Sequence, residues 1–99
     1  MPNLSKMLKQ AQKMQAKVQE EMDALVVEET AGGGMVTVRM TGQKELLKIT
    51  LDPSIVDAEE REMLEDLIVA AVNQASGKID EELQSKLGGL GGGMGLPGF

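Results

Sequence analysis

The chain has 99 residues, contains neither cysteine nor histidine, and carries a formal net charge of -6 at pH 7. Without these residue types it has no disulfide framework, no zinc-type site and no nucleophile paired with an imidazole base, so we expect neither enzymatic activity nor a metal or cofactor. No apolar run approaches the ~18 residues of a membrane-spanning helix. We therefore expect a soluble cytoplasmic protein that binds neither membranes nor a small-molecule substrate.

Charge is distributed unevenly along the chain. An excess of acids, taken alone, argues against a nucleic-acid partner, because phosphate binding needs clustered Lys and Arg. Residues 1–19, however, contain four lysines and no acid, whereas residues 52–66 contain seven Asp or Glu and the single Arg61. Screening limits each charge to a range of about 10 Å, so this local arrangement matters more than the sum.

Residues 3–25 are predicted to form an amphipathic helix. Apolar residues recur at intervals of three and four on one side, namely Leu4, Met7, Leu8, Ala11, Met14, Val18, Met22 and Leu25. The opposite side carries Lys6, Lys9, Lys13 and Lys17. These lysines are candidates for DNA binding, because they span ~16 Å, comparable to several phosphates along one strand. The alternative is that they only solvate the outer face of the helix.

Three short strands are predicted next, one from residue 25 to the Gly32-Gly33-Gly34 loop, one at residues 35–41 and one at residues 47–51. Apolar and polar residues alternate in the last two, as expected of strands with one buried face. A second long helix is predicted after Asp57, which with Glu60 resembles a capping box. We expect Gly88-Gly89 to end this helix. The folded domain then covers residues 1–87, and the glycine-rich residues 88–99 form a disordered tail.

The order helix, three-stranded antiparallel meander, helix defines an α+β fold. A strand of six residues spans ~20 Å, whereas the second helix would run ~45 Å, so one small sheet cannot cover both helices. We therefore expect a homodimer, because a two-fold interface needs only one self-complementary patch. The residues expected in the core or at the dimer interface are Met14, Val18, Val36, Val38, Ile49, Leu51, Leu67, Ala71 and Ala75.

Other charged residues offer weaker candidates. Arg39, Lys44 and Lys48 lie on or beside the polar face of the predicted meander, where they either extend a basic surface toward DNA or protect a sheet edge from pairing. The acids of residues 57–66 do not converge as metal ligands, and they complement the dipole at the start of the second helix. Along that helix, Arg61 is expected to pair with Glu65 at i,i+4. Lys78 and Lys86 are expected either to pair with Glu82 or to interact favourably with the C-terminal end of the helix.

Several segments together resemble one known family. They are residues 7–15 (MLKQAQKMQ), 34–38 (GMVTV), 49–54 (ITLDPS) and 62–71 (EMLEDLIVAA), followed by a tail of Gly, Met and Pro. In this order, and over nearly the whole chain, they resemble the YbaB/EbfC family. The resemblance implies a tweezer-like homodimer with protruding helices, which binds duplex DNA in the bacterial nucleoid and affects DNA shape and gene expression.

The leading hypothesis is a homodimer that binds duplex DNA through phosphates, with little sequence specificity. The only aromatic residue is Phe99, which argues against single-stranded nucleic acid, because its readers stack bases on aromatic rings. The alternative is a protein-interaction module that uses the long helices or the tail. The two differ in salt dependence, since phosphate binding weakens steeply with salt.

Overall fold

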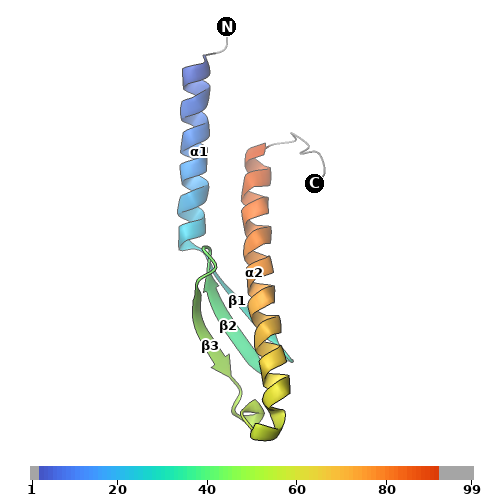
Figure 1. Ribbon diagram of the computed structural model, residues 1–99. Helices are drawn as coiled ribbons and strands as arrows, with labels where there is room; N and C mark the ends of the chain where they lie inside the picture. Colours follow the sequence, from blue (N-terminus) through green and yellow to red (C-terminus); the bar gives the residue numbers. More distant parts are fainter. Residues whose placement is uncertain (1–2, 92–99) are drawn as a thin grey trace.

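The computed structural model describes residues 3–91, and its elements follow the predicted order of helix, three strands and helix (Figure 1). They are α1 (Leu4–Ala24), β1 (Val26–Ala31), β2 (Val36–Thr41), β3 (Leu46–Leu51) and α2 (Arg61–Gly91), with 3-10 turns at Pro53–Ile55 and Ala58–Glu60. The α+β class and the antiparallel meander are confirmed.

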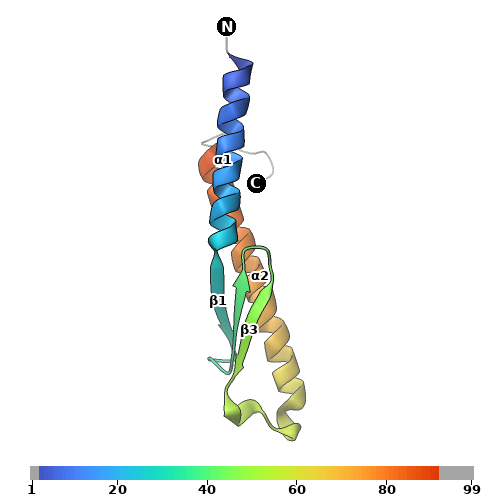
Figure 2. The same ribbon diagram turned by 90° about the vertical axis from the view of Figure 1, so that its left-hand side faces the viewer.

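Helix α1 begins after Asn3, whose side-chain oxygen accepts a hydrogen bond from the backbone N–H of Lys6 at 3.1 Å. This cap satisfies one of the N–H groups that the first helical turn leaves free. The helix ends where Leu25 becomes extended and leads into β1. Only Val18 and Met22, near the C-terminal end, are buried, so the N-terminal turns stand away from the sheet (Figures 1 and 2).

The strands form one sheet in the order β1-β2-β3. The predicted loop between β1 and β2 is a turn in which Gly32, Gly33 and Gly34 all have positive φ, a conformation that residues with a Cβ rarely adopt. The central strand β2 has the predicted alternation, since Val36 and Val38 are fully buried.

A bulge interrupts the pairing of β2 with β3. Arg39 lies opposite Lys48, and the next residue, Met40, lies opposite Leu46. Leu47 therefore has no partner in the ladder, and the simple alternation predicted for β3 does not extend to it.

Helix α2 lies across β1 and β2 and leaves β3 largely uncovered (Figure 1). Ala71 and Ala75 are fully buried, and their small side chains let the helix axis come close to the strands. The helix begins at Arg61, because residues 58–60 form a 3-10 turn that Asp57 caps by accepting a hydrogen bond from the N–H of Glu59 at 2.9 Å. The predicted capping box is replaced by this shorter turn.

The C-terminal end of α2 lies at Gly91, beyond the predicted end at Gly88-Gly89. A glycine inside a helix costs about 1 kcal/mol relative to alanine, so it weakens the helix without necessarily ending it. The rest of the predicted tail, residues 92–99, lies outside the described residues.

Most of the predicted core is buried within a single chain. Val18, Val36, Val38, Ala71 and Ala75 are buried, and Leu51 and Leu67 pack against them while partly exposed. Met14 and Ile49 remain exposed. Met14 precedes the part of α1 that enters the core, and Ile49 lies on the strand that α2 does not cover.

The β2–β3 turn fastens α1 to the sheet. The backbone N–H of Gly42 donates to the carbonyl oxygen of Leu25 at 3.0 Å. A Cβ at Gly42 would collide with the carbonyl oxygen of Met22. In the same turn, the side chain of Gln43 donates a hydrogen bond to Asp23. These contacts fix the direction in which α1 leaves the sheet.

Candidate nucleic-acid interface

The four lysines predicted to bind DNA, Lys6, Lys9, Lys13 and Lys17, are all exposed on α1. We call these four residues the lysine stripe. Because each residue turns a helix by about 100°, they fall within an arc of roughly 80°, on the side opposite the apolar face that leads to the core. The arrangement matches the prediction from the sequence.

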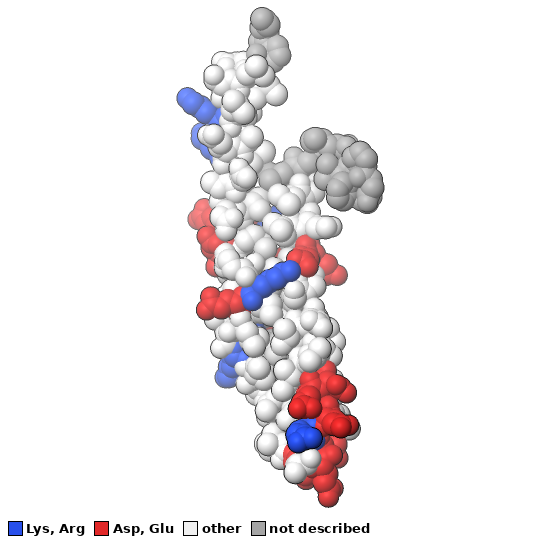
Figure 3. Space-filling model, viewed as in Figure 1, with Lys and Arg blue, Asp and Glu red and all other residues white. Residues whose placement is uncertain are grey.

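No residue in the range 3–91 forms an ion pair with the lysine stripe. Residues 4–17 contain no acid, and Glu20 and Glu21 follow Lys17 by three and four residues. The first turns of α1 extend beyond the acids of the body (Figure 3). The ammonium groups are therefore available to an external anion. Neutralising DNA phosphates with such groups releases counterions and favours binding.

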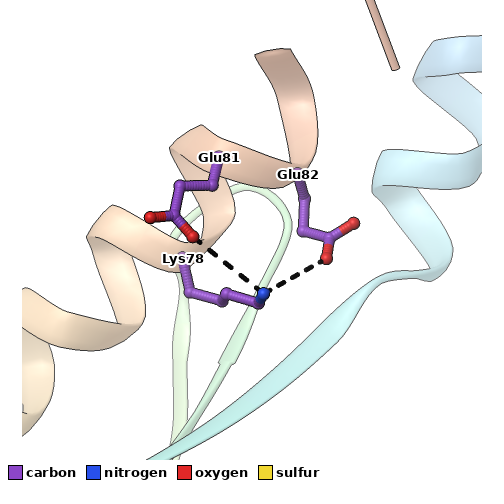
Figure 4. Close-up of polar contacts among 3 residues, drawn as sticks. All are labelled: Lys78, Glu81 and Glu82. Atoms are coloured by element: carbon purple, nitrogen blue, oxygen red, sulfur yellow. Dashed lines mark ion pairs between the residues drawn. The ribbon is translucent and has the colours of Figure 1, made fainter. Parts of the chain in front are cut away.

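The lysines of α2, by contrast, are paired with acids. Lys78 lies 4.0 Å from Glu81 and 3.7 Å from Glu82 (Figure 4), and the second of these pairs is the predicted one. Lys86 lies 3.7 Å from Glu21 of α1, a contact that no local sequence pattern indicates. Exposed ion pairs of this kind contribute little stability, but they offset the positive charge of α2.

The basic residues of the meander are less well placed than the lysine stripe. Lys44 is held in an ion pair of 2.9 Å with Asp80. Arg39 and Lys48 lie opposite each other, with Glu28 opposite Arg39 on the other side. All three alternate with residues that face α2, so they share the outer face of the sheet. This row of one acid and two bases carries less net positive charge than the four residues of the lysine stripe.

The acids of residues 57–66 gather at the end of the molecule farthest from the lysine stripe (Figure 3). Arg61 lies among them, but it does not form the predicted ion pair with Glu65 or pair with any other described acid. The Cα atoms span 70 Å along the longest axis. This distance far exceeds the screening length of about 10 Å, so the two ends act as separate electrostatic regions.

The remaining polar groups have structural roles. The side-chain hydroxyl and the backbone N–H of Ser54 donate to Asp52 at 2.7 and 2.9 Å and hold the pKa of that carboxyl below its ordinary value of 3.8. This pair caps the 3-10 turn at Pro53–Ile55. Within the described part of the chain, no group of side chains is arranged to hold a metal ion. No described helix is long and apolar enough to cross a membrane.

These features define a class of protein. An elongated chain that presents, at one end, a row of lysines unpaired with any described acid has the charge pattern of a nucleic-acid-binding protein. Comparison with known proteins assigns the family: residues 1–94 match the YbaB/EbfC DNA-binding family, and the chain belongs to it. The predicted resemblance is thus confirmed, for a family described by DNA binding and not by a catalytic activity.

Several bacterial relatives carry the name nucleoid-associated protein. One from Koribacter versatilis is 50% identical over 97 residues, covering 98% of this chain and 96% of the relative. Another, from Xanthomonas axonopodis pv. citri, is 50% identical over 98 residues, covering 96% and 91%. The crystal structure of an uncharacterized protein from Helicobacter pylori has a TM-score of 0.76 at 24% identity, covering 90% of this chain and 94% of that one. It shares the fold.

Proposed function

We propose that this chain binds duplex DNA as a homodimer, with little sequence specificity, through the lysine stripe of α1. The observation that carries the proposal is the availability of these four charges. They are exposed, they follow one face of a helix that stands away from the sheet, and none of the described acids pairs with them. Family membership supports DNA as the partner.

The chemistry of the lysine stripe favours low sequence specificity. A lysine ammonium is a compact point charge that suits phosphate oxygens, whereas sequence is read mainly by bidentate contacts to base edges. Arginine makes the commonest such contact, to guanine, and no arginine lies in the first 38 residues. Affinity should therefore depend strongly on salt and weakly on sequence.

An uncovered apolar surface supports the homodimer. Leu46 and Ile49 on β3 are each 40% exposed, and Val69 on α2 is 58% exposed. Val69 lies on the flank of α2 nearest β3, because Asp80, about three turns later on that flank, reaches Lys44 in the β2–β3 turn. Within residues 3–91, the outer edge of β3 also has no partner strand. A second copy can cover the apolar side chains and pair with this edge.

A homodimer of this kind presents two lysine stripes at a fixed separation. A duplex that contacts both must adapt its path to the protein, and DNA that is bent or twisted in this way stores deformation energy. We propose that the protein alters DNA conformation and thereby influences gene expression. Its site of action would be the nucleoid in the cytoplasm, in keeping with the names of its relatives.

The DNA surface is tested by replacing Lys6, Lys9, Lys13 and Lys17 together with Gln. Glutamine keeps a helix propensity close to that of lysine, so folding should survive. Gel shifts on duplex DNA at two salt concentrations should show most binding lost, with the salt slope reduced by about 0.9 for each missing phosphate contact. Unchanged binding would move the contact surface to Arg39 and Lys48. A parent chain that binds no duplex at low salt would leave the protein-interaction alternative.

The homodimer is tested by sedimentation equilibrium at micromolar concentration. The parent should sediment as a dimer, and Ile49→Asp should favour the monomer, because a carboxylate would be buried at the interface. Thr50→Asp is the matched control: it places the same charge on the same strand but on the other face of the sheet. A parent that is a folded, stable monomer would contradict the proposal.

A further inference from the structure

One apolar face follows the whole of α1, and only one end of it is covered. Near the C-terminal end, Val18 and Met22 are 8% and 6% exposed because they pack into the core. Toward the N-terminus, Leu4, Met7 and Leu8 are 70%, 55% and 63% exposed. We call the uncovered residues Leu4, Met7, Leu8 and Met14 the apolar stripe.

The rest of the described chain does not reach the N-terminal part of this stripe. The first turns of α1 extend past the end of α2 in both views (Figures 1 and 2). Single exposed apolar residues are common on proteins, but a contiguous row of large ones marks an interaction site. A partner is therefore needed to remove the stripe from water.

The apolar stripe lies on the side of α1 opposite the lysine stripe. Lys13, for example, is rotated by about 180° from Leu4 around the helix axis. A duplex bound along the lysines would therefore leave the apolar side open. The two faces of this one helix can serve two partners at once.

We infer that the apolar stripe pairs antiparallel with the same stripe of a second molecule, and that this pair joins two DNA duplexes. The inference rests on the proposed function of the lysine stripe. Antiparallel pairing is isologous, so one self-complementary patch is sufficient. Because each lysine stripe points away from the apolar seam, the pair presents lysines on two opposite sides, one side for each duplex.

Charge supports a second copy as the occupant. The side chains that border the apolar stripe are the neutral Gln10, Gln12 and Gln15. Two copies can therefore meet without like-charge repulsion, which would oppose self-association if the lysines lay on the seam. The border also offers no acid to attract a basic partner and no base to attract an acidic one.

The small size of the apolar stripe indicates that the contact forms mainly between molecules already bound to DNA. A stable interface uses about 20–30 residues on each side, whereas the apolar stripe offers four large side chains. Such a contact is too small to hold molecules together at low concentration. Molecules bound to DNA are at a high local concentration, which strengthens weak contacts between them.

The experiment measures binding of one duplex and capture of a second duplex in the same wells. One duplex is immobilised, the protein is bound to it, and a labelled duplex is added. The double variant Met7→Gln, Leu8→Gln should bind the first duplex within twofold of the parent but capture the second at least fivefold less. Met63→Gln is the matched control, since Met63 is 52% exposed at the opposite end of the molecule; it should capture as the parent does.

A cysteine variant gives an independent readout, because the chain contains no cysteine. Leu8 lies near the middle of the apolar stripe, so two Leu8→Cys thiols should be oxidised by added diamide to an intermolecular disulfide in the presence of duplex DNA. Met63→Cys should form it at no more than one fifth of that rate. Equal crosslinking of the two variants would contradict the antiparallel pair.

Other outcomes would also overturn the inference. Unchanged capture by the double variant would show that the apolar stripe does not join duplexes. A shift of that variant from dimer to monomer in sedimentation, without DNA, would place the stripe inside the homodimer. Loss of capture after deletion of residues 92–99 would show that this segment, and not a second apolar stripe, is what joins the two duplexes. If the parent fails to bind even the first duplex, the proposed function falls, and this inference falls with it.

Discussion

The two long helices of this chain differ in how much of their length packs against the rest of the molecule. Helix α2 lies along the sheet, with Ala71 and Ala75 fully buried against it. Helix α1 contributes only Val18 and Met22 to the core, and its remaining turns stand free. Lysines occur on both helices, but those of α2 are held in ion pairs, whereas those of α1 pair with none of the described acids.

The comparison shows that lysine content alone does not indicate which helix has charges available to an external anion. What matters is whether acids share the same stretch of structure. Glu81 and Glu82 follow Lys78 within one turn, whereas no acid lies within one turn of Lys6, Lys9 or Lys13. A helix that packs against little else can keep its basic side chains free for an external anion.

The largest effect is expected where α1 joins the sheet. Gly42→Ala should lower the free energy of unfolding by about 3 kcal/mol, at the upper end of overpacking costs, because its Cβ meets the backbone of α1. Gly77→Ala on α2 meets nothing within 4 Å and should stabilise by about 0.5–1 kcal/mol. Urea denaturation measures both. An unchanged free energy of unfolding in Gly42→Ala would mean that α1 is attached loosely to the sheet.

The next largest effect on stability compares a buried position of α2 with an uncovered position of α1. Ala75→Leu should destabilise by about 2 kcal/mol, because the added atoms have no space between α2 and the sheet. For a domain of this size, that corresponds to a decrease in Tm of roughly 10 °C. Ala11→Leu, on the uncovered part of the apolar face of α1, should change Tm by no more than about 2 °C. Equal losses would show that both helices are packed alike.

A smaller effect, on the affinity for duplex DNA, is expected when lysines of α1 are compared with lysines of α2. Lys9→Gln with Lys13→Gln should weaken duplex binding roughly tenfold, equivalent to about 1.4 kcal/mol, and lower the salt slope by nearly two units. Lys78→Gln with Lys86→Gln makes the same change in net charge and should leave both quantities unchanged. Fluorescence anisotropy over a salt series distinguishes the pairs. A similar loss for both would mean that net charge, not position, controls binding.

The smallest effect on stability is expected in the turn that precedes α2, where a substitution changes neither helix. Hydrogen bonds from Ser54 lower the pKa of Asp52 below 3.8, so its ionised form stabilises the fold. This contribution is fully present above pH 3.8 and is lost as the pH falls through the lowered pKa. Asp52→Asn should therefore give a slightly lower Tm at pH 7, and the difference should disappear in acid. A constant difference across this range would exclude the carboxylate as its cause.

Periodicity in the sequence was sufficient to predict both helices, the three strands and the lysine stripe. The helix predicted at residues 3–25 is α1, and Val36 and Val38 share the buried face of β2 as expected. These features depend on neighbours within a few positions along the chain. Local sequence therefore contains the information that determines them.

Features that depend on distant parts of the chain could not be predicted in the same way. The bulge at Leu47 depends on how two strands align, and the pairing of Lys86 with Glu21 depends on where α2 crosses α1. The covered and uncovered ends of the apolar face of α1 look alike in sequence. They differ because only the C-terminal end lies within reach of the core.

The separation of charge along this 70 Å molecule has a consequence for the rate at which it meets DNA. A polyanion repels the acidic end and attracts the lysine stripe, so its field turns the approaching protein until α1 leads. Steering of this kind raises association rates from about 10⁵–10⁶ M⁻¹s⁻¹ toward 10⁸ M⁻¹s⁻¹ at low salt. A chain with a net charge of -6 can thus associate quickly with DNA. Added salt lowers the association rate as well as the affinity.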